Sequence, residues 1–367
     1  MTASHAQAPV EPRGSSSPTN GAKRPSILVT SRIPSAVLER LEAACDVDAY
    51  RGGGTGLTAE ELRQRVKGKQ GLLCVLNDRI DKALMDAGSG LKVISTISVG
   101  YDNIDLTEAH ARGLVVTNTP DVLTNAVAEF TWGLILSITR RLAEGDRLIR
   151  SGGWQRWGLD FMLGSELRGK QLGIIGAGRI GRAVAAMAPA FGMRAVFAAR
   201  EGRAQETLPA GLRQGFGEAS PELVPGDEAD ERRREGSFVS LDELLVSSDV
   251  ISVHVPLKPE TRHLIDKRAL ARMKRSAYLI NTSRGPVLDE AAVAWALKER
   301  LIAGASLDVF EREPEVHPDL LSLENVVLVP HLGSATTETR TGMADLAARN
   351  LLEVLAGRLP LTPIARK

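Results

Sequence analysis

The chain has 367 residues, of which 43% are hydrophobic and 25% are charged, a composition typical of a globular protein. At roughly 150 residues per domain, this length predicts about two domains. The formal net charge of +1 offers no basic face for nucleic acid and no acidic tail. No stretch reaches the ~18 consecutive apolar residues that a membrane span needs. Cys45 and Cys74 lack the close spacing of metal ligands, so we expect reduced core thiols and no metal site.

The first 25 residues are rich in Ser, Pro, Gly and Ala and contain no apolar core. This composition predicts a disordered tail and excludes a secretory signal. We therefore expect a cytoplasmic protein whose order begins near Ser26.

Short apolar runs alternate with helical patterns from Ser26 onward. The expected strands cover residues 27–30, 71–76, 92–96 and 115–117, and the expected helices cover residues 34–45 and 105–112. A further helix should open after Thr58, because Thr58 and Glu61 have the spacing of a capping box. Buried strands that alternate with helices predict a parallel sheet covered on both faces.

A long helix is expected over 125–149, a second alternation runs from 172 to 329, and a last helix covers about 336–355. The rules for layers and handedness then predict an α/β protein with two doubly wound parallel-sheet (Rossmann-like) domains. The charged stretch 205–236 is longer than an ordinary connection, and we interpret it as a solvated insertion.

A glycine-rich motif, Gly176-Ala177-Gly178-Arg179-Ile180-Gly181, follows an expected strand and opens an expected helix. That context is typical of a dinucleotide-binding turn. Gly176 would permit the tight turn, Gly178 the approach of a pyrophosphate, and Gly181 close packing of helix and strand. The helix N-terminus, at Arg179 and Ile180, would supply free N–H groups for the phosphates. The alternative is a glycine-rich turn that binds nothing.

The next expected strand covers residues 195–199, and Arg200 follows it, with Arg203 close behind. NAD enzymes carry at this position a carboxylate that binds the adenosine ribose. An arginine can bind a 2′-phosphate, which a carboxylate would repel. We therefore predict NADPH as the preferred cofactor, with NADH possible. The alternative is a solvent-facing surface arginine.

Three polar segments follow expected strands in the second half of the chain, and they contain Arg284, Glu313 and His331. Open α/β sheets bind their ligands at such strand ends. Reduction of a 2-keto acid needs a cation for the carboxylate and carbonyl, an acid that protonates the oxygen, and a carboxylate that orients that acid. Arginine, histidine and glutamate fit these three roles. Singly, each could be a surface charge or a strand-end histidine; together, downstream of a dinucleotide motif, they predict a catalytic set.

These motifs resemble those of the D-isomer-specific 2-hydroxyacid dehydrogenases, most closely the glyoxylate/hydroxypyruvate reductases. The resemblance runs from about Ile27 to the C-terminus and is interrupted by the insertion. It rests on residues 98–102, 119–124, 176–181, 281–285, 307–309, 313–314 and 330–334. It implies reduction of glyoxylate or hydroxypyruvate to glycolate or D-glycerate by hydride transfer from the cofactor.

The resemblance also implies roles for individual residues. Arg284 would bind the substrate carboxylate and carbonyl, His331 would donate the proton, and Glu313 would orient His331. Further substrate contacts would come from Leu76, Asn77, Val99, Gly100, Ser334 and Trp157, with Val99 and Gly100 offering backbone N–H groups. Further cofactor contacts would come from Thr124, Val255, Pro256, Thr282, Ser283, Asp308 and Gly333, with Asp308 and Thr282 against the nicotinamide amide.

The implied architecture is discontinuous. A substrate domain would comprise residues 26–121 and 335–367, and a dinucleotide-binding domain, residues 122–334, would be inserted between them. The implied assembly is a homodimer in which Trp157 reaches the partner's active site, whereas Trp154 would serve in interface or core packing. Two other functions stay open: a dehydrogenase for a larger 2-hydroxy acid, and a dinucleotide-sensing corepressor of the same fold. The sequence shows no evident interaction tail that would favour the corepressor.

Overall fold

The computed structural model describes residues 24–53, 56–199 and 237–365. The predictions for tail residues 1–23, for Arg200 and Arg203, and for the insertion 205–236 therefore lie outside the described residues. Arg24 and Pro25, which the prediction placed in the tail, instead bind residues 45 and 46 beside the first sheet. Arg24 Nη2 donates to the Cys45 carbonyl at 2.7 Å, and the Asp46 N–H donates to the Pro25 carbonyl at 2.9 Å.

The N-terminal part forms a parallel five-stranded sheet in the order β2-β1-β3-β4-β5. Its strands are β1 (Ser26–Val29), β2 (Asp46–Ala49), β3 (Gly71–Cys74), β4 (Val93–Thr96) and β5 (Val115–Thr117). The connecting helices are α1 (Ser35–Ala44), α2 (Ala59–Arg65), α3 (Lys82–Ala87) and α4 (Leu106–Ala111). Thr58 caps α2 in the predicted capping box with Glu61. Cys45 and Cys74 are free and buried, as predicted.

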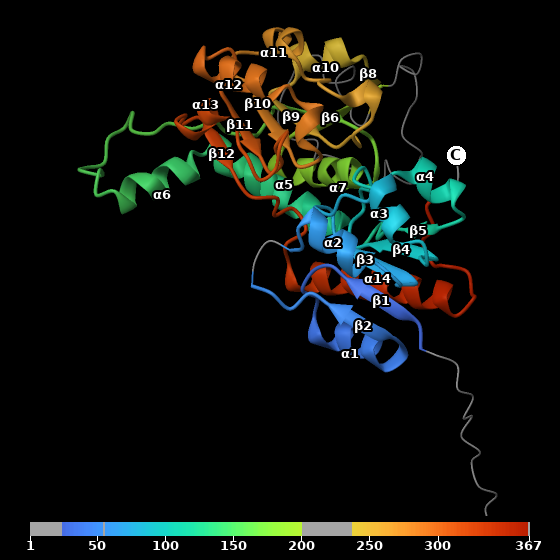
Figure 1. Cartoon of the computed structure of the whole chain (residues 1–367). Helices are drawn as coiled ribbons and strands as arrows, with labels where there is room; N and C mark the ends of the chain where they lie inside the picture. Colours follow the sequence, from blue (N-terminus) through green and yellow to red (C-terminus); the bar gives the residue numbers. More distant parts are fainter. Residues whose placement is uncertain (1–23, 54–55, 200–236, 366–367) are drawn as a thin grey trace, which may run out of the picture.

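The C-terminal helix α14 (Thr337–Leu355) returns to this first sheet (Figure 1). Its Ala344, Ala347 and Leu351 share one buried cluster with Ile27 and Leu73. The chain then continues along the free edge of β5, where the Ile364 N–H donates to the Val116 carbonyl at 2.8 Å. Segments more than 200 residues apart in the sequence thus complete one core.

The middle of the chain forms a parallel seven-stranded sheet in the order β12-β11-β10-β9-β6-β7-β8. Its strands are β6 (Gln171–Ile175), β7 (Arg194–Ala198), β8 (Phe238–Val239), β9 (Val250–Val253), β10 (Tyr278–Asn281), β11 (Gly304–Leu307) and β12 (Val326–Leu328). Its helices are α7 (Arg179–Met187), α10 (Leu241–Ser247), α11 (Lys267–Arg272), α12 (Glu290–Lys298) and α13 (Pro318–Leu321), with 3-10 turns at Ala188–Phe191, Pro259–Thr261 and Gly285–Val287. The prediction of two doubly wound parallel sheets is confirmed.

The long helix expected over 125–149 is wrong as one element. The structure has α5 (Thr124–Thr139), which packs on the second sheet, and α6 (Leu142–Arg150), which extends away from it (Figure 1). Arg141 breaks the helix with a left-handed backbone, φ 54°. The cause is tertiary: the Ser165 N–H donates to the Thr139 carbonyl at 2.8 Å, and Gly164 lies against the same carbonyl. No helix among the described residues is long and apolar enough to cross a membrane.

Candidate active site

The three predicted catalytic residues meet in one cavity of about 1120 Å³ between the two sheets. Each follows a neighbouring strand of the second sheet: Arg284 follows β10, Glu313 follows β11 and His331 follows β12. Leu76 and Asn77, from the loop after β3, line the same cavity. The strand-end placement that the sequence predicted brings the three catalytic candidates together, and Leu76 and Asn77 lie where the resemblance implied.

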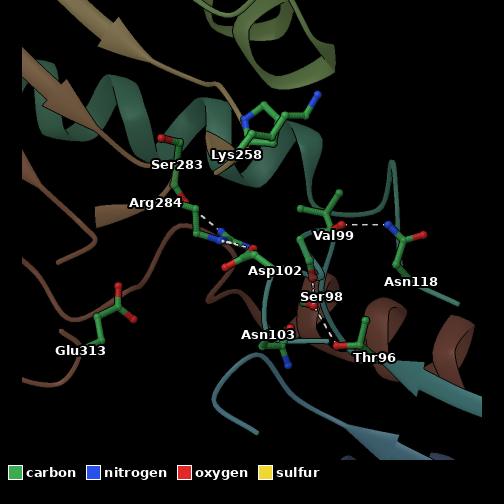
Figure 2. Close-up of polar contacts among 12 residues, drawn as sticks. Thr96, Ser98, Val99, Asp102, Asn103, Asn118, Lys258, Ser283, Arg284 and Glu313 are labelled. Atoms are coloured by element: carbon green, nitrogen blue, oxygen red, sulfur yellow. Dashed lines mark hydrogen bonds and ion pairs between the residues drawn. The ribbon is translucent and has the colours of Figure 1, made fainter. Parts of the chain in front are cut away.

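Arg284 is held by its own loop and by the first sheet. The buried Asn281 side chain donates to the Arg284 carbonyl at 3.0 Å and accepts from the Ser283 N–H at 3.0 Å, which closes the turn after β10. The Arg284 Nε donates to Asp102 Oδ1 at 2.9 Å (Figure 2). This contact leaves Nη2, the outer edge of the guanidinium, so close to Gly100 that a Cβ at residue 100 would clash with it.

Glu313 and His331 form a hydrogen-bonded pair, with 2.9 Å between Oε2 and Nδ1. The other carboxylate oxygen, Oε1, accepts from the Phe310 N–H at 3.1 Å. Burial raises the pKa of Glu313, but the contacts with His331, with the Phe310 N–H and with the charge of Arg284 outweigh burial and lower it. An ionised Glu313 makes Nδ1 the donor and leaves Nε2 as the nitrogen that can pass a proton.

Asp308 fixes the backbone on which His331 stands. Its two carboxylate oxygens accept from the Leu332 N–H at 2.6 Å and from the Gly333 N–H at 2.9 Å. The Asp308 carbonyl accepts from the His331 N–H at 2.9 Å. Burial raises the pKa of Asp308, although these N–H donors and His331 oppose the rise. His331 itself has a left-handed backbone, φ 53°, which costs energy for a residue with a Cβ and is held by these contacts.

The glycine motif has the geometry of a dinucleotide cradle. Gly176 has φ 112°, and a Cβ there would meet the His254 backbone at 2.7 Å. At Gly181 a Cβ would clash with the Gly176 carbonyl oxygen, so the absence of a side chain lets α7 pack tightly on its strand. At Gly178, which caps α7, a Cβ would meet nothing within 4 Å. Open space in front of a helix N-terminus fits the pyrophosphate of a dinucleotide.

The other described cofactor candidates lie on loops that follow strands of the second sheet, or at the starts of α5 and α7. Val255 packs against Gly176, and Pro256 follows it after β9. Thr282 Oγ1 lies 3.1 Å from Thr131 Oγ1 of α5, and Thr124 begins α5. Gly333 is buried, and a Cβ there would lie 3.1 Å from Asp308 Oδ2. Arg179 is exposed and pairs with Asp121 at 2.5 Å, so it contributes its backbone to the α7 N-terminus.

Three predicted residues stand apart from the centre of the cavity. Ser334 accepts from Arg340 Nε through its carbonyl, at 3.2 Å, and through its hydroxyl, at 3.0 Å. Trp157 is 74% exposed on the segment after α6 and does not line the cavity of its own chain. Trp154 is also exposed, so it does not pack in the core of its own chain, and its packing at an interface stays a prediction.

Sequence reasoning gave no role to Asp102, Asn281 or Arg340. Asp102 holds Arg284, Asn281 shapes the turn, and Arg340 lines the cavity. Asp102 stands two residues after Gly100 in a motif that the sequence had singled out, which is the one signal that could have identified it. Nothing near Arg340 in the sequence places this helix residue at the cavity.

Comparisons with known proteins identify the family of this chain. A family profile described as D-isomer specific 2-hydroxyacid dehydrogenase, NAD binding domain, matches residues 132–333. A glyoxylate reductase of Thermofilum pendens is 48% identical over 341 residues, which cover 92% of this chain and 93% of that protein. A glyoxylate reductase of Thermococcus kodakarensis is 42% identical over 348 residues, with coverage of 94% and 97%.

A solved structure extends the agreement to three dimensions. The NADPH-dependent glyoxylate/hydroxypyruvate reductase of Sinorhizobium meliloti, in complex with NADP and malonate, superposes with a TM-score of 0.76 at 34% identity. The match covers 94% of this chain and 97% of that one. This chain therefore belongs to the D-isomer-specific 2-hydroxyacid dehydrogenase family and is an NAD(P)H-dependent oxidoreductase.

Proposed function

We propose that the protein reduces glyoxylate or hydroxypyruvate to glycolate or D-glycerate, with NADPH preferred as the hydride source. The observation that carries this proposal is the convergence of Arg284 and the Glu313–His331 pair on one cavity. The names of the relatives, glyoxylate reductase and glyoxylate/hydroxypyruvate reductase, support the choice of substrate.

Arg284 and the backbone of Val99 and Gly100 bind the substrate carboxylate in this proposal. The planar guanidinium suits a carboxylate, and Arg284 also polarises the carbonyl that becomes the alcohol. Asp102 keeps the guanidinium in place without occupying its outer edge, because it binds Nε alone among the described contacts. Leu76 and Asn77 close the pocket from the first sheet, and Ser334, three residues after His331, would add a contact at its edge.

His331 delivers the proton to the carbonyl oxygen from Nε2 while Glu313 stabilises the imidazolium through Nδ1. A bound nicotinamide would supply the hydride for the carbonyl carbon. Asp308, Thr282, Ser283 and Gly333 would hold its ring and amide, while Thr124, Val255, Pro256 and the N-terminus of α7 would hold the rest of the dinucleotide. Arg200 and Arg203 bind the 2′-phosphate, which accounts for the preference for NADPH.

We also propose that residues 26–121 and 335–367 act as the substrate domain and residues 122–334 as the dinucleotide-binding domain, with closure between them after binding. We propose a homodimer formed through α6 and the segment that follows it. This arm exposes Leu142, Ile149, Trp154, Trp157, Leu159, Phe161 and Leu163. An apolar surface of this extent marks an interaction site, and a second copy would cover it.

A single spectrophotometric experiment tests the reaction. NADPH absorbance should fall when glyoxylate or hydroxypyruvate is added, with a higher kcat/KM than for bulkier 2-keto acids. Faster turnover of a bulky keto acid would instead identify a different D-2-hydroxyacid dehydrogenase, and no turnover of any keto acid would identify a dinucleotide sensor. A higher kcat/KM with NADH than with NADPH would refute the cofactor preference.

A further inference from the structure

One side chain outside the cavity holds the loop that is expected to bind the substrate carboxylate. Asn118 stands just after β5 and is half-buried. Its Nδ2 donates to the Val99 carbonyl at 2.8 Å. Figure 2 shows Val99 between Arg284 and Asn118, with its carbonyl turned toward Asn118 and away from Arg284.

The direction of the Val99 carbonyl fixes the direction of the next N–H. The peptide bond between Val99 and Gly100 is trans and planar, so the Gly100 N–H points opposite to the Val99 carbonyl. That direction is the side of Arg284, whose Nη2 already lies against Gly100. Among the residues that the structure describes, neither the Val99 N–H nor the Gly100 N–H has a hydrogen-bond partner. The Gly100 N–H is therefore a free donor aimed beside a guanidinium.

We propose that Asn118 is a positioning residue for substrate binding: it holds the peptide plane that aims the Gly100 N–H at the substrate carboxylate. This inference rests on the proposed function and deepens it. Without the amide of Asn118, the 99–100 peptide could rotate, and the substrate carboxylate would keep Arg284 but lose its backbone donor. A hydrogen bond to a charged group contributes more than a neutral one, so the loss should be measurable.

Asn118 is itself held from the C-terminal segment. The Thr362 hydroxyl donates to the Asn118 carbonyl at 2.6 Å, and the Asn118 N–H donates to the Thr362 carbonyl at 3.4 Å. The fully buried Asn350 of α14 binds both the Thr362 N–H, at 2.9 Å, and its hydroxyl, at 2.7 Å. These contacts connect α14 through Thr362 and Asn118 to the loop that contains Val99 and Gly100.

The backbone and the side chain of Asn118 have separate partners, which makes the proposal testable. The backbone binds Thr362 and completes the edge of the sheet, whereas the side chain binds Val99. A change of the side chain alone therefore leaves the C-terminal segment attached. If Asn118 served only the fold, its replacement would change stability without changing substrate affinity.

The experiment compares Asn118→Ala and Asn118→Asp in the full chain. The probe is oxamate, a non-reducible analogue with the carboxylate of a 2-keto acid, and its Kd is measured by calorimetry with saturating reduced dinucleotide. We expect Asn118→Ala to weaken oxamate binding roughly tenfold or more at every pH, the loss of one charged hydrogen bond. The Kd of the dinucleotide should not change, because the α7 cradle does not contact Asn118.

The aspartate variant supplies a readout that a purely structural role would not produce. In Asn118→Asp, the ionised carboxylate cannot donate to the Val99 carbonyl, whereas the protonated carboxyl can. The oxamate defect of Asn118→Asp should therefore be large at about pH 8 and shrink toward about pH 5, as the carboxyl begins to protonate. The control is Asn325→Asp. The Nδ2 of Asn325 also donates to backbone carbonyls, those of Leu297 and Ala303, but these lie near the starts of β11 and β12, at the opposite end of the strands from the cavity. It should leave oxamate binding unchanged.

Wild-type affinity for oxamate in Asn118→Ala would overturn the proposal. So would a defect of Asn118→Asp that does not change with pH, or an equal defect in Asn325→Asp, because both would indicate damage to the fold alone. Binding is read without turnover, so a protein that binds oxamate but does not reduce glyoxylate would refute the proposed function and leave this inference standing. A wild-type chain that does not bind oxamate would refute both.

Discussion

Each residue of the Glu313–His331 pair depends on a backbone contact as well as on its partner. The Phe310 N–H holds Glu313, and Asp308 holds the left-handed turn on which His331 stands. The proposed general acid is therefore held in place by the fold itself, as efficient proton transfer requires. Replacing each residue separately distinguishes the proposed acid from its proposed orienting partner.

Replacement of His331 should remove the acid while the loop stays intact. Asparagine is the suitable choice, because it tolerates the left-handed backbone better than alanine does. We expect His331→Asn to lower kcat by about 100- to 10,000-fold, the usual contribution of a general acid. The Kd of the cofactor, measured by fluorescence titration, should change little. His110→Asn, on α4, is the matched control, and unchanged turnover in His331→Asn would refute the assignment of the acid.

Glu313→Gln tests the orienting carboxylate through pH. The pKa of Glu313 is lowered, so the carboxylate stays ionised below the usual glutamate range, and its contribution to stability is lost only as the pH falls through that lowered value. An imidazolium beside a neutral amide loses its proton more readily than one beside a carboxylate. The kcat/KM for keto acid reduction should therefore decline at a lower pH in Glu313→Gln than in the wild type. Coincident pH profiles would contradict this role.

Within the strand–turn–helix unit of β6 and α7, two glycines differ in role: one allows close packing and the other leaves space for a ligand. Gly181 gives α7 its close approach to the strand, whereas Gly178 faces open space. Gly181→Ala would press a methyl group on the Gly176 carbonyl oxygen, and overpacking of this kind costs about 1–3 kcal/mol or more. Gly178→Ala is sterically free in the unliganded chain and should cost less than about 1 kcal/mol. It should still weaken dinucleotide binding, because the methyl group would occupy the space of the pyrophosphate.

Thermal unfolding and dinucleotide titration of these two variants should therefore give opposite results. Gly181→Ala should lower Tm by several degrees, at about 2–4 °C per kcal/mol for a unit of roughly 200 residues. Gly178→Ala should keep Tm and raise the Kd of the dinucleotide. Equal Tm losses in both variants would show that Gly178 has a packing role as well.

Local signals in the sequence predicted most elements, and contacts distant in sequence account for the rest. The glycine motif, the capping box at Thr58 and the strand-end polar segments are local, and the structure has each of them where it was expected. The break of the 125–149 helix was missed, because the group that ends α5 is the N–H of Ser165, more than twenty residues later. Asp102 was missed for the same reason: its partner, Arg284, comes from the other sheet. Such pairings depend on tertiary contacts, which hydrophobic periodicity does not encode.

In the whole molecule, Trp157 lies on the exposed arm, where it can contact its own chain or the cavity of a partner chain. The side chain is 74% exposed and lies on a segment that extends from the second sheet (Figure 1). An aromatic residue at this exposure contributes little to its own fold, so its replacement should be nearly neutral for stability. If the proposed dimer forms, the Trp157 side chain instead enters the cavity of the partner and excludes water there.

A mixed dimer distinguishes contact within a chain from contact between chains. We expect Trp157→Ala to remain dimeric by light scattering but to raise KM for the keto acid. In a dimer of Trp157→Ala with His331→Asn, one site keeps its own His331 and receives the intact Trp157 from its partner. That site should recover the wild-type KM, with about half the wild-type activity per dimer, because both substitutions fall on the other site. The control is a mixed dimer of a wild-type chain with a chain that carries both substitutions. In this dimer, the site that has His331 lacks the partner's Trp157. Failure of the first mixed dimer to recover would show that Trp157 acts within its own chain, and a wild-type KM in the Trp157→Ala homodimer would show that it has no role in the site.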